Sequence, residues 1–189
     1  MAALIFEFGT FAQRDFATPG EFLGRLDGFL WGLPRGWRYA VEIRNRDYLI
    51  PDYFGVLARH NVAHVFNAWT RMPALTEQIA IPDAFTADFS VTRALLSKGR
   101  TYEQAVNAWE PYEKIREPDP PTRTALRAIA ERALGKRQRA YVFVNNRLEG
   151  NAPATIEAVA GGDAGPVCAD AGVVVGCVEG AQQASPEEQ

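Results

Sequence analysis

Charged side chains lie near the ends of segments that have the character of strands. Glu42 and Arg44 are two residues apart in the segment 39–45, so both side chains face the same side of a strand. Arg93 lies late in the apolar segment 89–95. Glu42 could exchange a proton with a substrate whose anionic group is bound by the two arginines. An internal salt bridge between Glu42 and Arg44 or Arg93 is the alternative, and the sequence leaves both open.

Three asparagines extend this candidate site. Asn45 follows Arg44, and Asn145 and Asn146 end the predicted strand 140–146. The amides of Asn145 and Asn146 could bind substrate hydroxyl groups or cap the following loop, and the sequence favours neither. The predicted site consists of Glu42 as the catalytic acid or base and of the substrate-binding residues Arg44, Asn45, Arg93, Asn145 and Asn146.

Other kinds of chemistry have little support in the sequence. The chain has two histidines, His60 and His64, which are too few for a complete histidine-based metal site. We expect His64 to be packed within a strand and His60 to face solvent at the end of a helix. No Gly-rich phosphate loop, CxxC, HExxH or GxSxG motif occurs. We therefore predict no metal ligands, and the sequence does not indicate which cofactor, if any, the protein uses.

Strands and helices alternate along the chain. The predicted strands are 4–8, 39–45, 63–69, 89–95 and 140–146. The predicted helices are 18–33, 51–60, 101–117 with an interruption at Pro111, 119–135, and one that starts at 151. Thr18 and Asp119, each followed by a proline, are expected to cap the first turns of their helices. This alternation predicts an α/β fold made of parallel βα units.

The number of units bears on the architecture. The carboxyl ends of parallel strands meet at one edge, so the polar residues above should gather there. An eight-stranded βα barrel usually needs about 250 residues, and this chain of 189 residues is short by about three units. We therefore expect an incomplete TIM-barrel-like domain over residues 1–160. Residues 161–189 are expected to form a low-complexity, disordered tail, in which 173–175 could form a further strand.

Composition limits the partners and the compartment. The 20 basic and 23 acidic residues give a net charge of −3, which offers no reason to expect a nucleic-acid partner. No apolar run reaches the length of a membrane-spanning helix, and no basic region precedes Glu7 to suggest a signal peptide. Cys168 and Cys177 lie too near the end to cross-link the main body, so the reducing cytoplasm is the expected location.

Four ordered blocks resemble a known family. They are 39–45 (YAVEIRN), 69–73 (WTRMP), 99–102 (GRTY) and 145–153 (NNRLEGNAP). Over about residues 3–160 they are similar to the YecE-like proteins, the domain of unknown function seventy-two. The resemblance implies a βα barrel related to sugar isomerases, without an established reaction. The family's site positions correspond here to Glu42, Arg44, Asn45, Arg93, Asn145 and Asn146.

The same resemblance implies a longer amino-terminal part than this chain has. We therefore expect a truncated or split gene product, or a mispredicted start. Three hypotheses follow, and whether the protein is an enzyme stays open. It could act on a small anionic or sugar-like metabolite, or it could bind such an anion without converting it. It could also be a fragment that self-associates through its open sheet edges.

Overall fold

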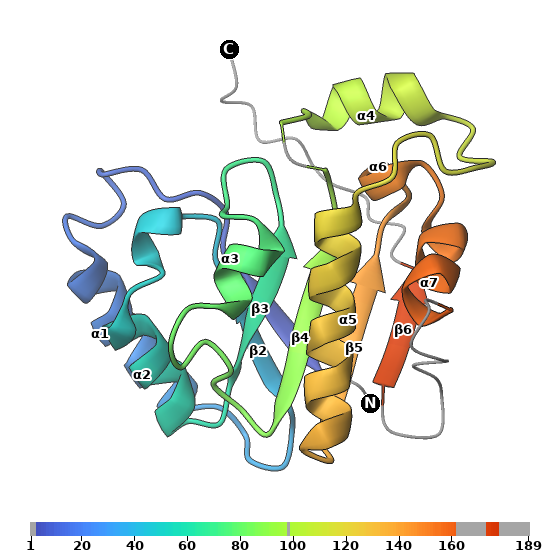
Figure 1. Ribbon diagram of the computed structural model, residues 1–189. Helices are drawn as coiled ribbons and strands as arrows, with labels where there is room; N and C mark the ends of the chain where they lie inside the picture. Colours follow the sequence, from blue (N-terminus) through green and yellow to red (C-terminus); the bar gives the residue numbers. More distant parts are fainter. Residues whose placement is uncertain (1–2, 98, 162–172, 178–189) are drawn as a thin grey trace.

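The computed structural model describes residues 3–97, 99–161 and 173–177 of the chain. Within these residues the chain forms one six-stranded sheet, in which every strand is parallel to its neighbours and the spatial order is the order in the sequence. The strands are β1 (Leu4–Glu7), β2 (Tyr39–Glu42), β3 (Ala63–Ala68), β4 (Phe89–Ala94), β5 (Arg139–Val144) and β6 (Val173–Cys177). The predicted parallel α/β architecture is therefore confirmed (Figure 1).

Helices connect the strands. The main ones are α1 (Pro19–Trp31), α2 (Pro51–Arg59), α3 (Leu75–Ile79), α5 (Pro120–Gly135) and α7 (Ala152–Ala160). Two short helices, η1 (Arg46–Tyr48) and α6 (Asn146–Glu149), follow β2 and β5 directly, and α4 (Tyr102–Trp109) follows β4. Figure 1 shows α4 lying across the carboxyl-terminal edge of the sheet, whereas α5 runs along its outer face. None of the helices in the described ranges has both the length and the apolar character needed to cross a membrane.

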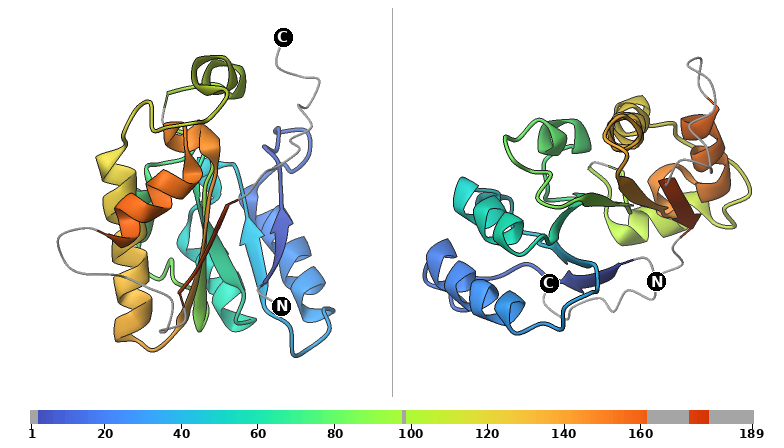
Figure 2. Two further views of the ribbon diagram at one scale, coloured as in Figure 1. Left: turned by 90° about the vertical axis from the view of Figure 1, so that its right-hand side faces the viewer. Right: turned by 90° about the horizontal axis from the view of Figure 1, so that it is seen from below.

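The sheet is curved, and the main helices follow its outer side. The view from below in Figure 2 shows α1, α2, α3, α5 and α7 arranged along this arc. Among the described residues, β1 pairs only with β2, and β6 pairs only with β5, so the barrel does not close. The arrangement is the incomplete TIM-barrel-like fold that the sequence predicts, with one strand more than expected.

Residues alternate between the two faces of the sheet. Val41 and Ile43 of the second strand segment are buried in the main core between the sheet and the helices. Ala40 belongs to a separate small cluster on the concave side, together with Val65 and Val91. This alternation turns the side chain of Glu42 to the concave side, as the sequence predicts.

Side-chain caps fix the amino-terminal ends of three helices. Thr18 Oγ1 accepts a hydrogen bond from the Glu21 backbone N–H, and Asp119 Oδ1 accepts one from the Thr122 N–H, so both predicted caps are confirmed. Asn151 likewise caps α7 through the Ala154 N–H. Three boundaries differ from prediction by more than one or two residues or at the site: β2 ends at Glu42 rather than at residue 45, β5 ends at Val144 rather than at residue 146, and the helix predicted over 101–117 is α4, which ends at Trp109.

The segment after residue 160 is described only in part. Residues 173–177 form β6, which pairs with β5 from Ala140↔Val173 to Val144↔Cys177. This is the alternative that the sequence left open for 173–175. The disorder predicted for the rest of 161–189 concerns residues 162–172 and 178–189, which lie outside the described ranges.

Candidate functional site

Four charged side chains meet on the concave side at the carboxyl ends of three strands. Glu7 ends β1 and is in register with Glu42, which ends β2. Arg44 follows β2 by two residues, and Arg93 lies near the end of β4. We refer to Glu7, Glu42, Arg44 and Arg93 as the ionic cluster. The structure therefore brings together the three charged residues predicted from the sequence.

Each arginine of the ionic cluster contacts both carboxylates. Arg44 Nη2 lies 2.5 Å from Glu7 Oε1, and Arg44 Nε lies 3.4 Å from Glu42 Oε1. Arg93 Nη1 lies 2.5 Å from Glu7 Oε2 and also contacts Glu42 Oε2. Two carboxylates thus balance two guanidinium groups. The internal salt bridges of Glu42 with Arg44 and Arg93, which the sequence left open, are therefore present in the structure.

Burial differs within the ionic cluster and affects protonation. The Glu42 side chain is fully buried, whereas that of Glu7 is 32% exposed. Burial raises the pKa of Glu42, although the positive charges of Arg93 and Arg44 oppose this rise. Burial alone would lower the pKa of Arg93, but the carboxylates of Glu42 and Glu7 outweigh it and raise that pKa. Burial therefore favours the neutral, protonated form of the Glu42 carboxyl group.

Trp69 connects the ionic cluster to α4. The Arg44 guanidinium carbon lies 4.1 Å from the centroid of the Trp69 ring, within the range of a cation–π contact. Trp69 also packs against the buried cluster formed by Leu96, Ala105 and Trp109. Arg44 is thereby held in place by an aromatic face in addition to its two carboxylate partners.

Glu7 is the member of the ionic cluster that the predicted site lacks. Its place near the end of the first strand is visible in the sequence, but its partners are not. The register Glu7↔Glu42 depends on β1 pairing with β2, and the contact with Arg93 joins residues 86 positions apart. Only the order of the strands in the sheet could have identified it.

Asn45 has a structural role in the described geometry. Its Oδ1 accepts a hydrogen bond from the Phe11 N–H at 2.7 Å, and its Nδ2 donates to the Phe11 carbonyl oxygen at 3.0 Å. Both ends of the amide thus bind the loop between β1 and α1. The predicted contact of Asn45 with a substrate stays a prediction.

Asn145 and Asn146 cap the segment that follows β5. Asn145 Oδ1 accepts from the Arg147 N–H at 2.9 Å, and Asn146 Oδ1 accepts from the Ala152 N–H at 2.8 Å. These contacts favour the capping interpretation over the binding of substrate hydroxyl groups. A substrate contact of either asparagine stays a prediction.

The two histidines lie outside the ionic cluster. His64 is buried, as predicted, with Nδ1 3.1 Å from the Tyr53 hydroxyl, and burial lowers its pKa to about 3. His60 differs from the expectation that it faces solvent, because its Nε2 lies 2.7 Å from Asp27 Oδ1 and its side chain is only 14% exposed. This contact joins α2 to α1, a tertiary pairing that the local sequence does not encode.

A second buried carboxylate, Glu149, was not predicted. It accepts hydrogen bonds from both Nε and Nη2 of Arg123, from the Thr155 hydroxyl and from the Asp119 N–H. Glu149 therefore joins the amino-terminal end of α5 to α6 and α7. These partners come from two other elements, α5 with its cap and α7, so Glu149 holds three helices together.

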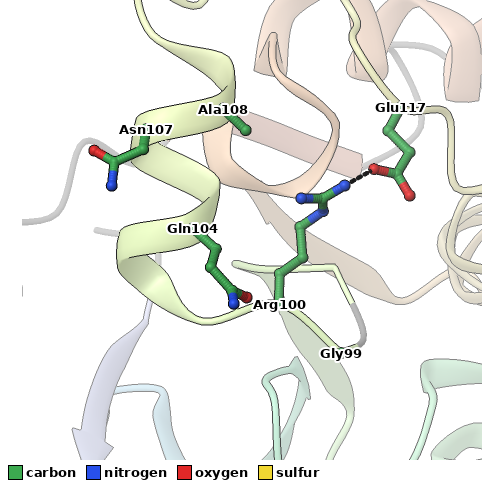
Figure 3. A pocket seen from close by; sticks show the side chains of 6 residues that line it. All are labelled: Gly99, Arg100, Gln104, Asn107, Ala108 and Glu117. Atoms are coloured by element: carbon green, nitrogen blue, oxygen red, sulfur yellow. Dashed lines mark hydrogen bonds and ion pairs between the residues drawn. The ribbon is translucent and has the colours of Figure 1, made fainter.

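Two hollows lie in the described chain, and Glu7 of the ionic cluster lines one of them. Figure 3 shows one of about 690 Å³ between α4 and the segment before α5, where Arg100 forms an ion pair with Glu117. Its lining also contains Gln104 and Asn107 of α4. The other, of about 410 Å³, lies between β1 and α1 and is lined mostly by phenylalanines, with Glu7 at its margin. In the described part of the chain, no group of three or more His, Cys, Asp or Glu side chains could hold a metal ion.

The fold and the site define a class of protein: an incomplete parallel βα barrel with a layer of paired charges at the carboxyl ends of its strands. The chain belongs to the family described as protein of unknown function DUF72, which it matches over residues 5–161. No curated protein and no solved structure matched the chain.

Proposed function

We propose that this DUF72 protein binds, and acts on, a small anionic or sugar-like metabolite at the ionic cluster. The observation that carries the proposal is the convergence of Glu7, Glu42, Arg44 and Arg93 on the concave side at the carboxyl ends of β1, β2 and β4. Catalytic groups of βα barrels lie at this end of the strands. The relation to sugar isomerases, the narrower affiliation with the YecE-like proteins and the cytoplasmic location are parts of this proposal.

The roles follow from charge and burial. Arg44 and Arg93 bind the anionic group of the ligand, which competes with the carboxylates for their N–H donors. Glu42 acts as general acid or base, because its raised pKa brings proton exchange closer to neutral pH. Glu7, with its more exposed side chain, is the carboxylate that an incoming anion displaces first.

The second candidate is a module that binds an anion without converting it, or a truncated fragment. One observation favours the absence of turnover: the carboxylate of Glu42, the proposed acid or base, is held by both Arg44 and Arg93, and Asn45 has both amide ends on backbone groups. A module of this kind would bind the same ligands but show no turnover. The substitution Glu42→Gln distinguishes the two candidates, because it removes the proton-exchanging group.

Binding is tested by thermal denaturation with inorganic phosphate, hexoses, hexose phosphates and small carboxylic acids. A ligand of the folded state raises the melting temperature with its concentration. We expect Arg93→Met to abolish the shift. The control is Arg132→Met, because Arg132 is a half-buried arginine over the Phe85 ring that is not part of the ionic cluster. If no compound shifts the transition, or if both variants respond as the wild type does, the proposed site is wrong.

A further inference from the structure

The sheet opens between β2 and β3 near their carboxyl ends. The last register pair of these two strands is Val41↔His64, whereas β3 stays paired with β4 as far as Ala68↔Ala94. The segment 42–44, which carries two members of the ionic cluster, lies beyond the last backbone pair with β3. The position of these two side chains relative to β4 therefore depends on other contacts.

Gln78 of α3 is fully buried and lies in this opening. The Asn67 N–H donates to Gln78 Oε1 at 3.2 Å, and Gln78 Nε2 donates to the carbonyl oxygens of Asn67 and Pro73, both at 2.7 Å. The Ala68 carbonyl oxygen accepts from the Leu96 N–H on the β4 side, so the backbone groups of Asn67 point toward β2. The Gln78 carboxamide therefore takes the place that a β2 residue would have in a longer ladder.

The side chain of Asn67 spans the remaining gap to the second strand segment. Its Nδ2 donates to the carbonyl oxygen of Ile43, the residue between Glu42 and Arg44, at 3.1 Å. Asn67 is fully buried, and its Oδ1 has no hydrogen-bond partner among the described residues. A buried acceptor without a partner lowers stability. The bond to Ile43 is therefore the contribution that distinguishes asparagine from an apolar residue at this position.

We propose that Asn67 is a positioning residue of the ionic cluster and that Gln78 supports it. This inference deepens the function proposed above and rests on it. The two carboxamides together set the separation of β2 and β3 where their ladder has ended. They thereby keep the Glu42 carboxylate in contact with Arg93, which lies on β4, beyond β3.

The backbone of segment 42–44 is held from both sides. The Glu42 carbonyl oxygen accepts from the Phe8 N–H on the β1 side, and the Ile43 carbonyl oxygen accepts from Asn67 on the β3 side. Without the Asn67 donor, the Ile43 carbonyl oxygen needs water as its partner, because buried carbonyl groups require a hydrogen bond. Water that reaches Ile43 also hydrates the adjacent Glu42, whose side chain is now fully buried.

The test follows the titration of the Glu42 carboxyl group by ¹³C NMR in the full chain without any ligand. In Asn67→Leu we expect the proton affinity of Glu42 to fall by at least about threefold, because burial is the main cause of its raised pKa. Gln78→Met should act in the same direction. The matched control is Thr92→Val, which also removes a buried polar group without a hydrogen-bond partner among the described residues. Thr92 faces the opposite side of β4 from Arg93, so this variant should leave the titration unchanged.

Two results of the titration would overturn the proposal. One is a Glu42 titration that stays that of the wild type in both Asn67→Leu and Gln78→Met, and the other is an equal shift in Thr92→Val. The wild type gives a readout that does not depend on the folding of a variant: the side-chain N–H of Asn67 should exchange slowly with solvent, and fast exchange would refute its bond to Ile43. Because no ligand is present, a failure to bind ligands contradicts the proposed function and leaves this result as it is.

Discussion

Glu42 is an acid on which burial and neighbouring charges act in opposite directions. Burial raises its pKa above the ordinary value of 4.5, in spite of the arginines beside it. The folded protein therefore keeps a proton at Glu42 at pH values where the unfolded chain has released it. The contribution of Glu42 to the free energy of unfolding is largest below pH 4.5 and decreases as the pH rises through the raised pKa.

The substitution Glu42→Gln should remove this decrease. Urea unfolding from pH 4 to pH 8 measures the slope of the unfolding free energy against pH for both proteins. Because glutamine stays neutral, as protonated Glu42 is, we expect the stability of the variant relative to the wild type to increase as the pH rises through the raised pKa of Glu42. Equal slopes for the two proteins would contradict the raised pKa.

The contribution of His64 to stability changes with pH in the direction opposite to that of Glu42. Burial lowers the pKa of His64 from 6.5 to about 3. Between these two pH values the unfolded chain binds a proton at His64, whereas the folded protein does not. The contribution of His64 to stability is complete above pH 6.5 and is lost as the pH falls toward 3, by about 5 kcal/mol at most. His64→Asn, which keeps a polar atom near the Tyr53 hydroxyl, should flatten stability between pH 6.5 and pH 4. His60→Asn should leave this slope in place, and a flat wild-type profile would contradict the assignment.

At the scale of the elements, Glu149 determines how α5, α6 and α7 fit together. Its buried carboxylate accepts two hydrogen bonds from Arg123 and one from Thr155. The substitution Glu149→Gln replaces one acceptor oxygen by a donor that faces the Arg123 guanidinium. We expect a loss of about 3 kcal/mol in the free energy of unfolding, measured by chemical denaturation.

Thr155→Val is the matched control for Glu149. It removes one hydrogen bond to the same carboxylate and keeps the side-chain shape, so about 1 kcal/mol should be lost. A Glu149→Gln variant no less stable than Thr155→Val would show that the Arg123 pair does not hold these helices together.

The elements themselves follow mostly from local sequence signals. Thr18 and Asp119 cap α1 and α5 as predicted, because capping depends on residues within one turn. Helix α6 escaped prediction because Asn145 and Asn146 directly follow the apolar run of β5 and were assigned to the end of that strand, although Asn145 caps the next turn. The His60–Asp27 contact escaped because it joins residues 33 positions apart.

The site was predictable to the extent that the positions of charged residues within single strands encode it. Glu42 and Arg44 share a face because they are two residues apart, and this periodicity needs no knowledge of the fold. Glu7 and Trp69 could not be assigned, because their contacts with Arg93 and Arg44 depend on strand order and on the curvature of the sheet. The sequence also could not decide between ion pairing and ligand binding, since both use the same side chains.

At the scale of the whole molecule, the open barrel explains why paired charges and an apolar edge occur together. The concave side carries small and apolar residues such as Ala40, Val65 and Val91, with the ionic cluster beyond them at the carboxyl ends of the strands. A closed barrel would cover both edges of this sheet, whereas here β1 has a strand on one side only among the described residues.

The most direct measurement is of the arginine side chains during ligand titration, by ¹⁵N NMR of their Nε–H groups. Inorganic phosphate, a hexose and a hexose phosphate are the probes, and Arg123 is the internal reference because it pairs with a buried carboxylate elsewhere in the fold. We predict saturable shifts of the Arg44 and Arg93 signals with an unchanged Arg123 signal. Signals of Arg44 and Arg93 that do not move with any probe, or that move no more than that of Arg123, would contradict a ligand site at the ionic cluster.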